Sequence, residues 1–215
     1  MQDELSPFVR EGVMEVVSPL LRGGQLCGQD PAACAPELRE RVIQTNEALA
    51  TLKTQVKQFV DEGKTVVFAD NGDPTIFSPW AWVPTHLTEF SPTVVPGLSS
   101  FNAANAALKR GVAGLGSVTI SSGTDLGAPD SHGRLCGTLV VFTHLKKLDE
   151  LLPALQQRYP ADTPVAIVCD VSYPGEKVIE GTLGTILSTL GDLKSLPHLY
   201  LLYVGDGLKQ EPGCR

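Results

Sequence analysis

The sequence has 215 residues, of which 42% are hydrophobic and 19% charged, a balance typical of a globular chain with one large domain or two small ones. Its 17 Lys and Arg against 24 Asp and Glu give a net charge of −7, which disfavours a surface that binds the phosphates of nucleic acid. No run of about 18 apolar residues occurs, so the sequence predicts no membrane-spanning helix.

The amino-terminal residues and the cysteines favour a cytoplasmic protein. The start, MQDELSPFVREGVMEVV, lacks the basic beginning and the apolar centre of a secretion signal. The five cysteines form no CxxC pair, which disfavours a zinc ribbon or a thioredoxin-like motif, and we expect reduced thiols. The four histidines show no HExxH-type spacing, so no metal site is predicted.

Helices and strands alternate along the chain from Pro36 onward. Apolar residues at helical spacing after Pro36, followed by Gly63, predict a long first helix. Short β-branched runs bounded by Gly, Pro and Asn predict strands. In chain order the predicted elements are helix 36–60, strand 65–70, helix 79–90, strand 93–95, helix 101–110, strands 117–123 and 138–143, helix 145–159, strand 163–170, an extended stretch after 177, a helix near 182–190 and strand 198–204.

This alternation predicts an α/β fold in which helices cover a mixed or mostly parallel sheet. The proline-rich stretch 91–96 favours a division into two α/β lobes. The predicted domains are therefore an N-terminal lobe, 1–93, and a C-terminal lobe, 94–215.

Three turns follow predicted strands, where open α/β sheets place their ligands. In the first, 71–74, Gly72 lets a ligand approach the backbone and Asp73 can accept hydrogen bonds. The second, 95–100, carries serines that cap a helix or donate to a ligand. The third is 169–174. Taken alone, each turn is explained better as an ordinary turn or helix cap than as a ligand site. No Walker A, GxGxxG or GxSxG motif occurs, which disfavours ATP hydrolysis, dinucleotide binding and serine hydrolysis.

Taken together, four segments resemble the tetrapyrrole (corrin/porphyrin) methylases. In the family's order they are GKTVVFADNGDPTIFSP (63–79), VVPGLSSFNAANAALKRG (94–111), GTLVVFTHLKKLDELLPALQQRYPADTPVAIV (137–168) and SYPGEKVIEGTL (172–183). The region that they span, 63–183, is more than half of the chain. SSFNAANAAL and the last segment are most similar to the precorrin-4/cobalt-precorrin-4 C11-methyltransferases of cobalamin biosynthesis.

The resemblance implies a homodimer of two-lobed chains, each with S-adenosyl-L-methionine in a trough between its lobes, that methylates a carbon of a precorrin or cobalt-precorrin tetrapyrrole. Because such a carbon is already nucleophilic, positioning supplies most of the protein's contribution. No catalytic base is assigned, although Asp73 and Asp170 lie in suitable turns. The cofactor-binding residues implied by the family's motifs are Asn71, Gly72, Asp73, Ile76, Ser100, Phe101, Thr143 and Val171. Candidate partners for the substrate's carboxylates are Lys109, Arg110 and Arg134, for which a solvated surface charge is an equally good interpretation.

The sequence departs from the family pattern in three places. Family members begin with a strand and a GxGPGDP-type loop, and no such segment precedes Gly63, so we expect either a start upstream or a divergent member. Thr143 and Val171 replace an expected methionine and glycine. These departures keep open an alternative function, a non-catalytic or divergent member that binds a tetrapyrrole or the cofactor. Relatives that methylate ribosomal RNA or a protein histidine are a third class, and the acidic balance disfavours RNA.

Overall fold

The computed structural model describes residues 17–113, 116–197 and 199–209. It divides into two compact units, 1–97 (unit 1) and 98–215 (unit 2), and each is described by itself. Among the described residues, no helix is long and apolar enough to cross a membrane.

Unit 1 is organised by the long helix α2 (Pro36–Asp61), which confirms the first predicted helix. Pro36 occupies its first turn, where the missing N–H costs nothing. Gly63 follows its end with φ of 75°. One face of α2 packs against Leu21, Trp82 and Leu87. The buried residues on that face are Val42, Thr45, Leu49, Leu52 and Val56.

The other helical elements of unit 1 are short. They are η2 (Pro19–Leu21), η3 (Pro31–Ala33), α3 (Val83–His86) and η4 (Thr88–Phe90). The predicted continuous helix 79–90 is therefore wrong, because Leu87 leaves the helical conformation (φ −117°, ψ 33°) between α3 and η4. Leu87 is buried there, and its burial stabilises the break.

The two strands predicted in unit 1, at 65–70 and 93–95, are not strands in the structure. Val66 and Phe68 face the unit 1 core while Val67 is 78% exposed, so the alternation of a strand is present. No described residue pairs with this backbone, and β propensity alone does not make a strand without a partner. The segment 93–95 likewise forms no strand with any described residue, and its Val95 is 75% exposed.

Unit 2 is built on a five-stranded sheet in the order β1-β2-β5-β3-β4. Its strands are β1 (Val118–Ser121), β2 (Thr138–Phe142), β3 (Pro164–Cys169), β4 (Lys177–Thr182) and β5 (Tyr200–Val204). Only β1 and β2 pair in parallel, and the other neighbouring pairs are antiparallel. The sheet is therefore mixed, which is one of the two arrangements predicted from the sequence. The other, a mostly parallel sheet, is wrong.

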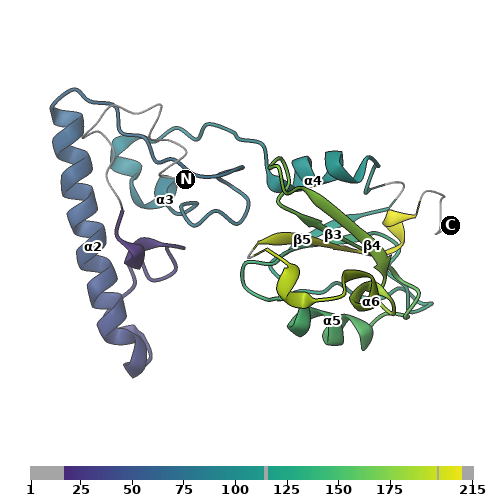
Figure 1. Cartoon of the computed structure of the whole chain (residues 1–215). Coiled ribbons are helices and arrows are strands. Elements are labelled where there is room, and N and C mark those ends of the chain that lie inside the picture. The colour runs from purple at the N-terminus through teal and green to yellow at the C-terminus, as the bar shows by residue number, and fades with distance from the viewer. Residues whose placement is uncertain (1–16, 114–115, 198, 210–215) are drawn as a thin grey trace. The chain divides into compact units, whose positions relative to one another are not determined.

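Helices cover both faces of this sheet, which confirms the α/β class (Figure 1). Helix α4 (Ser100–Leu108) lies on one face, and α5 (Leu148–Gln156) and α6 (Ile186–Leu190) lie on the other. All five residues of β5 are buried, because this strand is central and packed on both sides. Two short elements complete the unit, η5 (Leu193–Ser195) and η6 (Asp206–Leu208).

The cysteines only partly match the expectation of reduced thiols. Cys27, Cys34 and Cys169 are free, whereas Cys136 is disulfide-bonded. Burial raises the pKa of the Cys169 thiol to about 11, although the charge of Lys177 acts in the opposite direction. Cys169 is therefore an unreactive core residue at neutral pH.

Candidate functional site

The directions of the strands define two ends of the unit 2 sheet. Strand β5 runs antiparallel to both β2 and β3, and β1 runs parallel to β2, so β1, β2 and β3 all point the same way. We call the end where they finish the carboxyl edge and the opposite end the amino edge. Open α/β sheets bind ligands at the carboxyl ends of their strands.

Thr143 lies at the carboxyl edge, directly after β2. Its hydroxyl donates to the carbonyl oxygen of Tyr200 and accepts from the Tyr200 amide at 3.2 Å. The residue is only 1% exposed. The hydroxyl therefore extends the pairing of β2 with β5, and a contact between Thr143 and the cofactor stays a prediction.

Val171 lies at the same edge, in the turn that follows β3. It is half-buried between Asp170 and Ser172, which have φ of 45° and 68°. Left-handed backbone costs a residue other than glycine about 1 kcal/mol. The Ser172 amide donates to the Glu176 carboxylate at 2.9 Å, which helps to hold this strained turn in place.

Ser100 and Phe101 form the first turn of α4. The preceding Ser99 is buried, and its hydroxyl accepts from the Phe101 amide at 3.2 Å, which caps the helix. Phe101 is half-buried and packs against the same core cluster as Phe142 and Val171. Two of the predicted cofactor-binding residues, Phe101 and Val171, thus pack against the same apolar cluster of unit 2 and stay partly exposed.

The other predicted cofactor-binding residues belong to the 71–76 loop of unit 1. Asp73 accepts hydrogen bonds at Oδ1 from the amide and hydroxyl of Thr75, at 2.8 and 2.7 Å. These bonds hold the pKa of Asp73 below its usual value, which makes its carboxylate a poor proton acceptor. Its Oδ2 makes no hydrogen bond within the described part of the chain and is available to accept from a ligand. Ile76 is half-buried, and its amide donates to the Asp73 carbonyl oxygen at 3.3 Å.

A close backbone contact within unit 1 joins this loop to Gly97. A Cβ atom on Gly97 would overlap the carbonyl oxygen of Gly72. Gly72 itself has φ of 78°, a conformation that favours glycine. Asn71 and Gly72 are exposed. The loop therefore presents accessible backbone next to Gly97, the kind of surface that a ligand approaches closely.

Two predicted substrate cations are already engaged by the chain. Arg134 donates to both carboxylate oxygens of Asp206, from Nε at 2.7 Å and from Nη2 at 3.0 Å, and pairs with Asp162 at 3.3 Å. The Asp206 side chain is 2% exposed. Arg110 pairs with Glu180 at 2.7 Å and donates to the Leu208 carbonyl oxygen at 3.0 Å.

These cations lie toward the amino edge of the sheet. Arg134 precedes β2, and Asp206 follows β5 and donates its amide to the Leu135 carbonyl oxygen at 2.8 Å. Arg110 follows α4 and reaches η6 at the same end. Lys109, in the left-handed conformation at the end of α4, is exposed. A strand of six residues, about 17–20 Å, separates the amino edge from Thr143 and Val171. Binding of substrate by these three cations stays a prediction.

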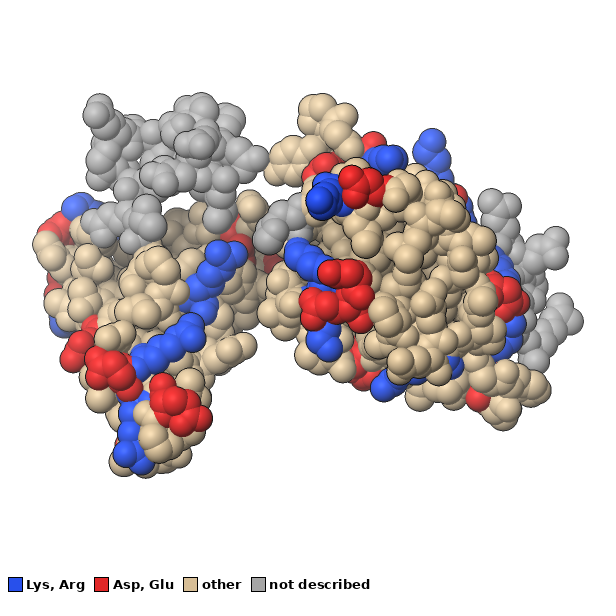
Figure 2. All heavy atoms as spheres, turned by 60° about the horizontal axis from the view of Figure 1, so that its bottom comes forward, with Lys and Arg blue, Asp and Glu red and all other residues tan. Residues whose placement is uncertain are grey.

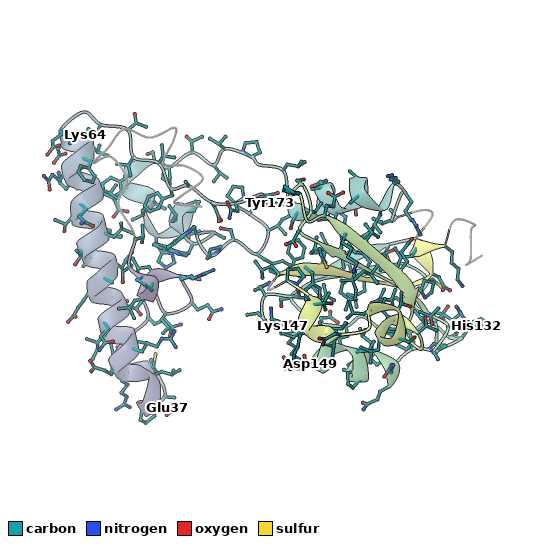
Figure 3. The ribbon with its side chains drawn as sticks, viewed as in Figure 1. Glu37, Lys64, His132, Lys147, Asp149 and Tyr173 are labelled. Atoms are coloured by element: carbon teal, nitrogen blue, oxygen red, sulfur yellow. The ribbon has the colours of Figure 1, made fainter. Side chains whose placement is uncertain are left out.

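Other cations lie at the carboxyl edge, and sequence reasoning missed them. Lys177 is exposed and begins β4 opposite Cys169. Lys147 donates to the Thr143 carbonyl oxygen at 3.2 Å, and Figure 3 shows it at the same end of the sheet as Tyr173, with His132 at the other end. On the face drawn in Figure 2, acidic and basic side chains lie interspersed among uncharged ones, and neither sign forms a large patch. The signal for Lys177 was its position, directly after the third turn.

Among the described residues, no group of three or more His, Cys, Asp or Glu side chains is placed to hold a metal ion. The 71–76 loop of unit 1 offers backbone groups and one carboxylate to a ligand, and unit 2 separately offers the apolar side chains of Phe101 and Val171.

Comparison with protein families gives a match over most of the chain. A family model described as Tetrapyrrole (Corrin/Porphyrin) Methylases matches residues 12–187. The match includes both the 71–76 loop and the carboxyl edge of unit 2.

Several curated proteins are similar in sequence. The precorrin-4 C(11)-methyltransferase of Mycobacterium tuberculosis (strain ATCC 25618 / H37Rv) is 31% identical over 177 residues, which span 75% of this chain and 70% of that protein. The precorrin-4 C(11)-methyltransferase of Rhodococcus erythropolis is 33% identical over 197 residues, which span 83% and 77%. The cobalt-precorrin-4 C(11)-methyltransferase of Methanocaldococcus jannaschii is 28% identical over 164 residues, which span 69% and 62%.

Solved structures show the same fold. A cobalt precorrin-4 methyltransferase, described as a cobalamin biosynthetic enzyme, superposes with a TM-score of 0.61 at 19% identity over 75% of this chain and 72% of that one. The uroporphyrin-III-C-methyltransferase from Thermus thermophilus gives a TM-score of 0.56 at 27% identity over 74% and 68%.

Proposed function

Because this chain belongs to the tetrapyrrole (corrin/porphyrin) methylase family, we propose that it is a C-methyltransferase acting on a precorrin or cobalt-precorrin intermediate of cobalamin biosynthesis. The observation that carries the proposal is the repeated similarity, at about 30% identity, to proteins named precorrin-4 or cobalt-precorrin-4 C(11)-methyltransferase. Methylation at C11 is the specific activity proposed.

The methyl donor of this family is S-adenosyl-L-methionine, whose sulfonium supplies an electrophilic methyl group. The residues present fit such a molecule. The backbone of Asn71 and Gly72 is accessible, Oδ2 of Asp73 is available as an acceptor, and Phe101 and Val171 offer an apolar surface. Asn71, Gly72, Asp73 and Ile76 would hold its polar part, and Ser100, Phe101, Thr143 and Val171 would surround the remainder.

In this proposal the chain acts mainly by orientation. The substrate carbon is a nucleophile without help from a Ser-His or Cys-His pair, so the protein has to align it with the methyl group and keep water away. Asp73 stays ionised because Thr75 holds its pKa low. Its negative charge therefore serves to attract the cationic methyl donor rather than to remove a proton.

The substrate carries several carboxylates, and exposed lysines are suitable partners for them. Lys177 lies at the carboxyl edge near Val171, so it is placed better than the cations of the amino edge. A homodimer and a cytoplasmic location are also part of the proposal, supported by the resemblance to the family and by the composition of the chain.

The test is to incubate the full chain with methyl-labelled S-adenosyl-L-methionine and either precorrin-4 or cobalt-precorrin-4. The expected result is one labelled methyl group per tetrapyrrole, detected by mass spectrometry. S-Adenosyl-L-homocysteine should also bind in calorimetry. Binding of both ligands without transfer would favour a non-catalytic or divergent binding member, and absence of both binding and transfer would refute the proposal.

A further inference from the structure

A buried tyrosine in the centre of the unit 2 sheet reaches the first turn of α4. Tyr203 of β5 pairs with Val140 on one side and Ala166 on the other, and it is 0% exposed. Its hydroxyl donates to Oδ1 of Asn105 at 2.9 Å and lies 3.3 Å from the carbonyl oxygen of Phe101. Asn105 is one helical turn after Phe101, so both acceptors lie on one face of α4.

We propose that Tyr203 and Asn105 are positioning residues that fix the first turn of α4, and with it Ser100 and Phe101, for binding of the methyl donor. This assignment rests on the function proposed above. Neither side chain needs to touch the donor, because each acts through the backbone and register of the helix.

The composition of α4 explains why the helix needs such an anchor. Four of its nine residues are alanine, and its buried residues are Ala104 and Leu108. Alanine buries little apolar area, and each buried methylene contributes only about 0.8 kcal/mol. Apolar packing therefore resists a small shift of α4 along the sheet only weakly. A directional hydrogen bond from the rigid central strand defines one position of the helix.

The environment keeps the Tyr203 hydroxyl in the state that this role requires. Burial raises the pKa of Tyr203 far above its ordinary value, so the hydroxyl retains its proton and stays a donor. A buried hydroxyl without a partner would cost about 1–3 kcal/mol. The bond to Asn105 satisfies it, and the Phe101 carbonyl oxygen lies within reach as a second acceptor.

The test compares four variants of the full chain: Tyr203→Phe, Asn105→Leu, the double variant and Asn105→Asp. Tyr203→Phe removes only the hydroxyl, and Asn105→Asp keeps an oxygen acceptor for it. The probe is S-adenosyl-L-homocysteine in calorimetry, with denaturant unfolding as a separate measure of stability. KM and kcat for methyl transfer are measured on the same samples.

We expect Kd for S-adenosyl-L-homocysteine to rise about fivefold in Tyr203→Phe and in Asn105→Leu. Kd should rise no further in the double variant, because the two substitutions remove the same hydrogen bond. Asn105→Asp should bind within about twofold of the unchanged chain. KM for the methyl donor should rise while kcat is kept, since the helix positions the donor and not the reacting atoms.

Three results decide the matter. If Tyr203→Phe lowers stability but leaves Kd unchanged in the folded protein, the two residues are only structural and the inference is wrong. If Asn105→Asp binds as weakly as Asn105→Leu, the hydrogen bond is not the cause and the inference is also wrong. If the unchanged chain does not bind the probe, the proposed function fails and this assignment with it.

Discussion

The carbonyl oxygen of Gly72 occupies the space that a side chain on Gly97 would need. Two parts of unit 1 more than twenty residues apart in the sequence therefore meet backbone to backbone, and the 71–76 loop carries residues predicted to bind the methyl donor. The contact requires glycine at position 97 for its size and not for its conformation, since only Gly72 of the pair has a positive φ.

Replacing Gly97 with alanine should weaken binding of the methyl donor. The added methyl group would push against a backbone oxygen that cannot rotate away, and the 71–76 loop would have to shift. We expect Kd for S-adenosyl-L-homocysteine to rise at least about tenfold, because a displacement of about 1 Å is enough to impair a positioned site. Calorimetry measures the effect.

Gly111→Ala is the matched control for this change. Gly111 has no atom within 4 Å of an added Cβ and no positive φ, so the same substitution there should be tolerated. Equal affinities for Gly97→Ala and the unchanged chain would contradict the role given to the Gly72–Gly97 contact.

Arg134→Leu should destabilise unit 2. The change would remove the guanidinium from the buried carboxylate of Asp206, which keeps its ion pair with Lys209 at 2.9 Å. Loss of one member of a buried pair is strongly unfavourable, and with Lys209 retained we expect a loss of about 2 kcal/mol in the free energy of unfolding. Denaturant unfolding measures it. Lys109→Met, at an exposed position, should leave the stability unchanged.

The same pair predicts how stability depends on pH. Hydrogen bonds from Arg134 and then from Lys209 hold the pKa of Asp206 below its usual value. A lowered carboxyl pKa stabilises the folded state above the unfolded pKa of about 3.9, and this contribution is lost as the pH falls through the folded-state pKa. The unfolding free energy of the unchanged chain should therefore exceed that of Asp206→Asn by a constant amount above about pH 5.

Below about pH 4 that difference should shrink. Other carboxyl groups whose pKa values are also lowered, such as Asp73 and Asp130, are present in both proteins and cancel in the comparison. A difference that stays constant down to about pH 2 would show that Asp206 is not the group that titrates.

Sequence patterns predicted unit 2 better than unit 1 for a physical reason. Runs such as TLVVF and PVAIVC are buried on both faces, so their composition alone indicates a strand, and their neighbours in the chain provide the partners. The pairing directions depend on which strands meet in space. Composition did not reveal that β5, the last strand, lies between β2 and β3.

The candidate site was predictable where it depends on local sequence and unpredictable where it depends on distant contacts. Gly72 and the cap before Phe101 are local features. By contrast, the engagement of the Thr143 hydroxyl by Tyr200, and of Arg134 by Asp206, joins residues more than fifty positions apart. The segment YLLYVGD places Asp206 directly after an apolar strand. That position was a signal in the sequence that the aspartate is buried and paired with a cation such as Arg134.

The extended segment 65–70, which pairs with no strand among the described residues, leads to a prediction about hydrogen exchange. Within the described part of the chain its amides have no backbone acceptor, whereas those of β3 lie between β4 and β5. We expect amides 66–70 to exchange at least about a thousandfold faster than those of 165–169, as measured by mass spectrometry or NMR. Protection across 66–70 would contradict this and would show that another strand pairs with the segment.

Lys177→Glu should weaken binding of the tetrapyrrole substrate. Lys177 is exposed at the carboxyl edge beside the turn that carries Val171, so reversing its charge replaces attraction to a substrate carboxylate with repulsion. KM for the tetrapyrrole should rise about tenfold, while Kd for S-adenosyl-L-homocysteine should change little. The effect should diminish at high ionic strength, because charges at an exposed site are screened. Lys109→Glu provides the comparison at the amino edge. A larger rise in KM in Lys109→Glu than in Lys177→Glu would contradict the prediction and would favour substrate binding by the amino-edge cations that the sequence predicts.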